Sequence, residues 1–264
     1  MRPFINVFGK SLPAYGLMLV AAGAAAWLAV IALSKIKKRP GGDASLVCLI
    51  GISGGLIGAY MLRPLMKLIE VAVSWEKYKA VPAGELLSYM TGEIVFYGGL
   101  LGGMAAVVIF CVKFKIKLVP MFDLGAAALT LAHAIGRVGC FLGGCCYGVE
   151  VPAGHPLSVV YPPASLGAPP GVPLLAAPLI ESAFLLVLFA ALTVIYLKSD
   201  RDGLCSSVYL LVYPAGRFIL EFFRGDLIRG SYGWFTTSQF ISIGIFIFGV
   251  IYLIRATTPS ATWN

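Results

Sequence analysis

The chain has 264 residues, of which 59% are hydrophobic and only 12% charged, and its formal net charge is +8. Soluble domains carry about 25% charged residues, so this composition excludes an ordinary soluble domain and indicates an integral membrane protein. The lysines lie in short clusters beside apolar runs, and no basic stripe interleaved with aromatic residues is present. The positive charge therefore indicates membrane topology, and we expect no nucleic acid partner.

About seven apolar runs come close to the ~20 residues that a bilayer requires. The first run lacks a small-residue cleavage site before its basic stop, so we expect no cleavable signal peptide. The fold class that follows is an all-α integral membrane protein, with about seven transmembrane helices around a polar cavity that opens to the outer face. We expect a single polytopic domain over residues 1–264. The runs cover residues 12–34, 44–62, 94–112, 118–135, 174–197, 205–223 and 237–254.

Short basic segments follow the first, third, fifth and last runs, which is typical of cytoplasmic loops. This asymmetry predicts an N-terminus outside and a C-terminus inside. The long segment 63–93 argues mildly against it with four basic residues, but that segment also holds four glutamates. The basic residues that set the orientation are Lys35, Lys37, Lys38, Arg39, Lys113, Lys115, Lys117, Lys198, Arg201 and Arg255.

The stretch from His133 to Gly148, HAIGRVGCFLGGCCYG, concentrates the chemistry of the chain. Its glycine density predicts that its second half is not a regular helix, and successive backbone N–H groups there can bind an anion. Arg137 adds a fixed positive charge. We expect residues 136–173, which also hold several prolines, to form a loop region on the outer face. The alternative is a glycine-rich connection whose cysteines only pack.

A second polar group lies in residues 216–226, GRFILEFFRGD. Arg217, Glu221 and Arg224 are spaced i, i+4, i+7 and would share one helix face, where Glu221 could bridge the two arginines. Charges inside a span usually face a cavity, and convergent arginines suit a phosphate. The alternative is that Arg224 reaches the headgroups while Arg217 forms a structural pair.

Tyrosines open two runs at the predicted outer face. Tyr15 begins the first, and Tyr97, followed by Gly98 and Gly99, begins the third. A lone interfacial tyrosine is more often an anchor at the membrane surface than a site residue. The glycine pair permits a close approach of another helix, which favours a site at Tyr97.

In this order and spacing, the motifs resemble the prolipoprotein diacylglyceryl transferase family of the bacterial inner membrane. The resemblance rests on Tyr-Gly-Leu-Met at Tyr15, Tyr-Gly-Gly-Leu at Tyr97, Gly-Arg-x-Gly-x-Phe at Gly136, and Arg-Phe-Ile-Leu-Glu-Phe-Phe-Arg at Arg217. Glu181, in Pro-Leu-Ile-Glu, is similar to the glutamate that opens the family's fifth span. Family members transfer a diacylglyceryl group from phosphatidylglycerol to the thiol of a lipobox cysteine.

The resemblance implies a transferase with a phospholipid donor and a protein or small thiol acceptor. We expect no cofactor and no resident metal. The resemblance also implies phosphate recognition by Arg137 and Arg217. The catalytic set that we expect is Arg137, Arg217, His133, Cys140 and Cys145. The substrate-binding set is Tyr15, Tyr97, Gly98, Gly99, Gly136, Gly139, Cys146, Gly148, Glu221 and Arg224.

Three positions depart from the family pattern. Cys140 replaces an asparagine, Cys145 replaces a glutamate, and Tyr97 replaces a histidine, whereas His133 appears upstream of the core motif. His133 is then the candidate base, and a thiol beside Arg137 could act as a nucleophile that carries the lipid group. These departures leave open a phospholipid-modifying transferase with a different acceptor.

Other interpretations of the cysteines also stay open. His133, Cys140, Cys145, Cys146 and His155 could hold a metal, although their spacing matches no common zinc motif. Cys140 could form a disulfide with either of the other two cysteines. A non-catalytic phospholipid-binding protein would keep the arginines and need none of the thiols.

Overall fold

The structure is a computed structural model that describes residues 3–7, 9–38, 41–79, 81–90, 95–226, 231–232 and 235–258. The chain divides into two compact units, residues 1–39 with 119–264 and residues 40–118. Long apolar helices dominate both units, because backbone polar groups inside a bilayer must be satisfied within the element itself.

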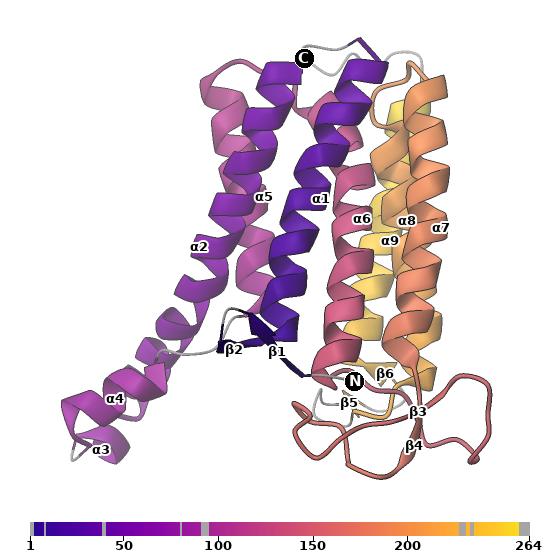
Figure 1. The fold of residues 1–264 in the computed structure, drawn as a ribbon. Coiled ribbons are helices and arrows are strands. Elements are labelled where there is room, and N and C mark those ends of the chain that lie inside the picture. Colours follow the sequence, from indigo (N-terminus) through magenta and orange to yellow (C-terminus); the bar gives the residue numbers. More distant parts are fainter. Residues whose placement is uncertain are drawn as a thin grey trace. The chain divides into compact units, whose positions relative to one another are not determined.

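The first unit is a bundle of helices that run side by side (Figure 1). It consists of α1 (Ala14–Ile36), α6 (Leu118–Gly143), α7 (Ala177–Lys198), α8 (Leu204–Leu220) and α9 (Thr237–Thr257), and one 3₁₀ turn, η1 (Glu221–Phe223), continues α8. Close packing joins α8 to α9, because a Cβ at Gly249 would lie 2.8 Å from the Leu210 carbonyl oxygen.

Three short antiparallel strand pairs lie at one end of this bundle (Figure 1). They are β1 (Phe4–Val7) with β2 (Lys10–Pro13), β3 (Ser158–Val160) with β4 (Pro173–Leu175), and β5 (Ser231–Tyr232) with β6 (Phe235–Thr236). The segment between α6 and α7 has its own small core of Tyr161, Ala168 and Leu174. This segment is therefore folded against itself.

The second unit is built on a close pair of helices, α2 (Gly41–Val73) and α5 (Phe96–Lys113), with α3 (Trp75–Tyr78) and α4 (Ala83–Met90) between them in the chain. A Cβ at Gly98 would lie 2.3 Å from the Gly58 carbonyl oxygen, and one at Gly102 would lie 2.6 Å from that of Gly54. Only glycine allows the two backbones to come this close. The close helix approach expected at Gly98 is confirmed.

The membrane class is confirmed. Five described helices, α1, α2, α6, α7 and α9, are long and apolar enough to cross a bilayer, and Tyr97–Lys113 is a shorter apolar helix. The run expected at 205–223 corresponds to α8, which has 17 residues and contains Pro214. The polar cavity and the single domain stay predictions.

Two predicted boundaries are wrong. The helix expected over 44–62 extends as α2 from Gly41 to Val73 and passes through Pro64. The helix expected over 118–135 continues as α6 to Gly143, so the loop region begins at Gly144 and not at 136. Gly139 explains the second difference, because its Cβ position lies 2.9 Å from Met18 Cβ, and this contact with α1 offsets the cost of a helical glycine.

A carboxylate within the fourth apolar run has a structural role at the end of the bundle away from the strand pairs. Asp123 is buried in α6 and accepts hydrogen bonds from the backbone N–H of Gly203 at 2.6 Å and of Ser206 at 2.8 Å. The Ser206 hydroxyl also donates to it. These N–H groups open α8, so Asp123 caps that helix from a neighbouring helix.

Candidate functional site

The first element of the site is a buried ion pair between α6 and α7. Arg137 Nη2 lies 3.0 Å from Glu181 Oε1, and both side chains are almost completely buried. Arg137 Nε also donates to His133 Nε2 at 3.3 Å, one turn earlier on α6. The Ser182 hydroxyl donates to the Ala134 carbonyl and fixes the two helices beside this pair. The Arg137 guanidinium is thus held in one orientation.

The second element joins the end of α8 to the start of α9. Arg217 Nη2 lies 2.6 Å from Glu221 Oε2, and Glu221 Oε1 accepts from the Thr236 hydroxyl at 2.9 Å. Thr236 is the N-cap of α9 and forms a capping box with Gln239. Arg217 also approaches the Ser238 hydroxyl at 3.5 Å. Glu221 therefore holds Arg217 and anchors α9 at the same time.

The prediction that Glu221 bridges two arginines is wrong. Arg224 pairs with Asp226 in a two-point contact of 2.8 Å and 2.6 Å. The helical spacing failed because α8 ends at Leu220 and Arg224 has extended backbone. Gly148 lies between two neighbouring backbone segments. It forms a β-bridge with Arg224 on one side, and its N–H donates to the Leu175 carbonyl on the other.

The charges of the three arginines are therefore balanced pair by pair, by Glu181, Glu221 and Asp226. No net positive charge remains within these three pairs. The groups still interact electrostatically, because Arg217 feels the charges of Glu181, Arg224 and Arg137. An anion can still be bound through hydrogen bonds, because a guanidinium has five N–H donors and one carboxylate cannot use them all. Arg217 Nη1 is buried and has no hydrogen-bond partner among the described residues.

Tyr15 and two glycines of the core motif bring α1 to the end of α6. The Cβ position of Gly139 lies 3.3 Å from a ring carbon of Tyr15, and that of Gly143 lies 3.7 Å from Tyr15 Cβ. Gly136 has nothing within 4 Å of its Cβ position, so packing does not explain a glycine there. Tyr15 thus lies beside the turn that follows α6.

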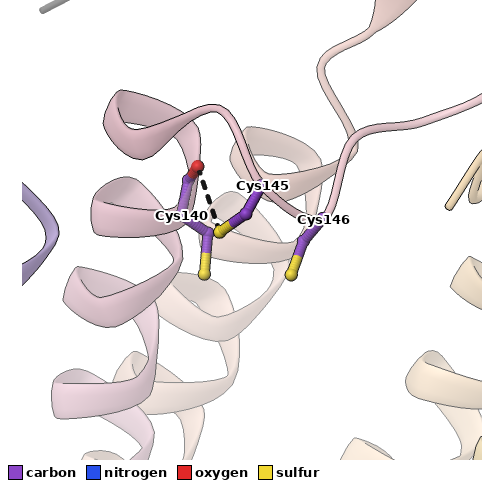
Figure 2. A group of neighbouring side chains, drawn as sticks. All are labelled: Cys140, Cys145 and Cys146. Carbon is purple, nitrogen blue, oxygen red and sulfur yellow. Dashed lines mark hydrogen bonds between the residues drawn. The ribbon is translucent and has the colours of Figure 1, made fainter. Parts of the chain in front are cut away.

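That turn brings three thiols together. Cys140, in the last turn of α6, and the adjacent Cys145 and Cys146 have sulfur atoms that all lie within 4.8 Å of one another. None of these three cysteines forms a disulfide. Figure 2 shows their sulfur atoms on the same side of the turn, with Cys145 Sγ beside the Cys140 carbonyl oxygen at 3.7 Å. His133 and His155, which the sequence left open as further metal ligands, do not belong to this cluster.

The pKa values of two of the three thiols shift in opposite directions. Hydrogen bonds from the Cys140 and Cys145 thiols, and then the Arg224 guanidinium, hold the pKa of the Cys146 thiol below its ordinary value. Hydrogen bonding to Cys140 and Cys146, followed by burial, raises the pKa of the Cys145 thiol. Of the three thiols, Cys146, which lies beside Arg224, is therefore the one whose deprotonation the cluster favours.

The structure brings together the predicted site residues of the first unit. Tyr97, Gly98 and Gly99 belong to the second unit, where the glycines pack α5 against α2. Sequence reasoning gave no site role to Glu181, Tyr213, Asp226 or Thr236. Tyr213 contacts His133 edge-on with ring centroids 5.0 Å apart. Glu181 carried a usable signal, since it is a lone carboxylate inside an apolar run.

The fold and these pairs define a multi-pass membrane protein with a buried arginine–carboxylate site next to a thiol cluster. A family model described as "Prolipoprotein diacylglyceryl transferase" matches residues 3–255. The chain belongs to this family of bacterial inner-membrane enzymes and is a transferase.

Individual relatives agree with this assignment. The chain is 33% identical to the phosphatidylglycerol–prolipoprotein diacylglyceryl transferase of Clostridium tetani, over 95% of this chain and 98% of the relative. It is 32% identical to transferase 2 of Clostridium perfringens, over 93% and 91% of the two chains. The Gloeobacter violaceus enzyme is 31% identical over 72% of this chain and 71% of its own.

Proposed function

We propose that this protein transfers the diacylglyceryl group of phosphatidylglycerol to the thiol of a cysteine in a prolipoprotein. Arg217 and Arg137 bind the phosphate of the donor, and Glu221 and Glu181 hold the two guanidinium groups in place. The names of the relatives support this donor and this acceptor.

The observation that carries the proposal is the unpartnered nitrogen of Arg217. Its side chain is 8% exposed, and Nη1 has no hydrogen-bond partner among the described residues. A buried donor without a partner costs about 1–3 kcal/mol, more when the group is charged. A phosphate oxygen at Nη1 removes this cost and forms a charge-assisted hydrogen bond.

The chemistry follows from where charge develops. The acceptor sulfur attacks the glyceryl carbon that bears the phosphate ester, a C–S bond forms, the C–O bond breaks, and glycerol phosphate leaves. Negative charge increases on the leaving phosphate in the transition state. Donors that are already oriented there stabilise it without reorganisation, and removing one such donor typically costs about 3 kcal/mol.

The test is a transfer assay on the full chain in detergent, with phosphatidylglycerol labelled in its headgroup and a peptide that carries a lipobox cysteine. Released glycerol phosphate and the mass of the peptide are both measured. We expect Arg217→Ala and Arg217→Lys to reduce turnover at least ~100-fold, because lysine cannot supply a second fixed donor. Arg255→Ala, in the exposed last turn of α9, is the control and should keep full turnover.

Near-native turnover of a folded Arg217→Ala protein would refute the phosphate assignment. Release of glycerol phosphate without a peptide adduct would instead favour the second candidate, a phospholipid-modifying transferase with a different acceptor. The observation behind that candidate is the convergence of Cys140, Cys145 and Cys146, any of which could carry the lipid group covalently. Mass spectrometry of trapped protein tests it, since a lipid-sized adduct would appear on one of these thiols.

The same proposal includes an orientation. The N-terminus lies outside, the C-terminus inside, and the ends of α6 and α8 that carry the arginines lie at the outer face, where the acceptor meets the enzyme. The support is the basic residues at the ends of two helices and just beyond them. These are Lys35 in the last turn of α1 with Lys37 and Lys38 after it, and Lys198 in the last turn of α7 with Arg201 after it.

A further inference from the structure

The three thiols after α6 are arranged by a backbone that is unusual for cysteine. Cys146 has φ of 60°, a left-handed conformation that a residue with a Cβ rarely adopts. Gly144, two residues earlier, has φ of 71°, and its Cβ position lies 2.6 Å from Ser165 Cβ, so only glycine fits there. The turn thereby directs two adjacent side chains to one side, whereas adjacent side chains in a strand would point to opposite faces.

The turn is also fixed from several directions. The Cys145 N–H donates to the Cys140 carbonyl at 3.1 Å, and the N–H groups of Leu166 and Ala168 donate to the carbonyls of Gly143 and Gly144. The Gly225 N–H donates to the Tyr147 carbonyl just after the turn. A strained backbone conformation persists only where the surrounding contacts hold it. These hydrogen bonds therefore hold the three thiols in a preorganised arrangement.

The spacing of the sulfur atoms suits a metal ion. Zinc binds thiolate at about 2.3 Å, which places the sulfur atoms of a tetrahedral site ~3.8 Å apart. The three sulfur atoms already lie within 4.8 Å of one another. Side-chain rotations that shorten the sulfur–sulfur distances by about 1 Å would give the spacing of a tetrahedral zinc site. Thiolate ligands favour zinc over harder ions. Arg224 and Arg137 keep N–H donors beyond those that their carboxylate partners use, and they interact favourably with thiolate at Cys146 and Cys140.

We propose that Cys140, Cys145 and Cys146 bind one zinc ion and that its fourth position receives the acceptor thiol of the transfer reaction. The role of the fourth position rests on the proposed function, whereas zinc binding by the three thiols does not. Three protein ligands with one open position are typical of catalytic zinc, whereas structural zinc usually has four protein ligands.

A zinc ion would deprotonate the acceptor thiol without the help of His133. His133 Nε2 already accepts a hydrogen bond from Arg137, so this nitrogen is not available as a base. A thiol bound to zinc loses its proton outright, and here the proton passes to water. The bound thiolate sulfur then attacks the glyceryl carbon of the donor, the C–S bond forms, the C–O bond breaks, and glycerol phosphate leaves with the bonding electron pair. No electron transfer is required.

The test is cobalt(II) substitution in the reduced full-length protein, purified in detergent and freed of metal with a chelator. We expect one equivalent of cobalt to give a sulfur-to-cobalt charge-transfer band and the visible bands of a four-coordinate ion, and zinc to remove both. Cys140→Ser, Cys145→Ser and Cys146→Ser should each weaken cobalt binding at least ~10-fold, since even the loss of an indirect supporting group has effects of that size. Cys48→Ser, in α2 of the second unit, is the matched control and should bind cobalt normally.

A variant that fails to fold would give the same loss of cobalt, so each is checked by thermal unfolding. Cys145→Asp is a second variant, which keeps an anionic ligand and should bind cobalt with a weaker sulfur-to-cobalt charge-transfer band, because one thiolate is lost. The proposal is overturned if the wild-type protein shows no charge-transfer band, if the three serine variants bind cobalt as well as Cys48→Ser does, or if mass mapping finds a disulfide between Cys140 and Cys145 or Cys146 in protein prepared without oxidant.

The fourth position is tested separately from catalysis. A lipobox peptide with its cysteine should shift the cobalt spectrum in the absence of any phospholipid, and the same peptide with serine should not. An unchanged spectrum would overturn the acceptor role. If the spectrum shifts but no lipid is transferred when phosphatidylglycerol is added, the zinc site and its thiol ligand are supported and the proposed transfer function is refuted instead.

Discussion

Arg137 and Glu181 form a buried ion pair, with 3.0 Å between Nη2 and Oε1, that joins α6 to α7 beside the thiol cluster. Arg137 needs this partner because an isolated charge at membrane depth is costly. The pair also leaves Arg137 with further N–H donors on a side chain that cannot turn away. Glu181 is thus a positioning residue for Arg137, and its charge has consequences that can be measured.

Glu181→Gln should lower both stability and turnover. Removing one partner of a buried pair leaves the other charge uncompensated, which costs about 3–5 kcal/mol. We expect a clear fall in the melting temperature in detergent and at least a ~10-fold loss of turnover, since a misplaced phosphate donor costs a comparable share of the barrier. Glu150→Gln, on the exposed segment after the thiol turn, is the control and should change neither quantity. A Glu181→Gln protein with native stability would show that the pair is not needed to hold Arg137.

Gly148→Ala should disrupt the link between the thiol turn and Arg224. A Cβ at Gly148 would lie 2.6 Å from the Leu175 carbonyl oxygen and 2.9 Å from that of Phe223, so the ladder on both sides must open. Arg224 pairs with Gly148 across that ladder. We therefore expect turnover to fall and the segment 144–176 to be cleaved faster by a protease, both in the same variant. Limited proteolysis and the transfer assay measure the two effects. Gly125→Ala, in α6 with nothing within 4 Å of its Cβ position, should leave both unchanged.

The sequence predicts the helices well because a bilayer imposes a minimum apolar length, and α1, α7 and α9 follow the apolar runs closely. It predicts the end of α6 poorly. Glycine lowers helix propensity, but a contact with α1 at Gly139 offsets that cost, and such a tertiary contact leaves no local signal. For the same reason the partner of Arg137 could not be identified, although Glu181 stands out as a carboxylate in an apolar run.

The site at the end of α8 shows a different limit. Helical spacing predicted Arg224 on the face of Arg217 and Glu221, and this is correct only while the helix continues. The chain leaves the helix at η1, and Arg224 turns to Asp226 and the thiol cluster. The Arg217–Glu221 pair was predictable because Glu221, the C-cap of α8, still has helical backbone and lies one turn after Arg217.

Asp123→Ala should destabilise the protein from the end opposite the strand pairs. The carboxylate accepts from the N–H groups of Gly203 and Ser206 and from the Ser206 hydroxyl, all at the start of α8. Loss of an N-cap costs about 0.5–2 kcal/mol, and the buried N–H groups left without a partner add to this. We expect a lower melting temperature, with Asp123→Asn less affected because it keeps one acceptor oxygen. Asp200→Ala, whose side chain is 97% exposed, should melt like the wild type, and equal melting of all three variants would contradict the capping role.

Gly98→Ala should separate α5 from α2. The new Cβ would lie 2.3 Å from the Gly58 carbonyl oxygen and 2.7 Å from Leu62 Cβ, both too close for any rotation to relieve. The helices must move apart along the Gly54–Gly102 contact as well, and overpacking of this kind typically costs about 1–3 kcal/mol. Gly84→Ala, in α4 of the same unit with nothing within 4 Å, should be neutral or slightly stabilising, because alanine favours a helix by up to about 1 kcal/mol over glycine. Thermal unfolding of the two variants in detergent distinguishes these outcomes.

If Gly98→Ala melts no lower than Gly84→Ala, the glycine pair is not needed for packing. A direct role of Gly98 at the substrate then becomes the better explanation for a glycine after Tyr97.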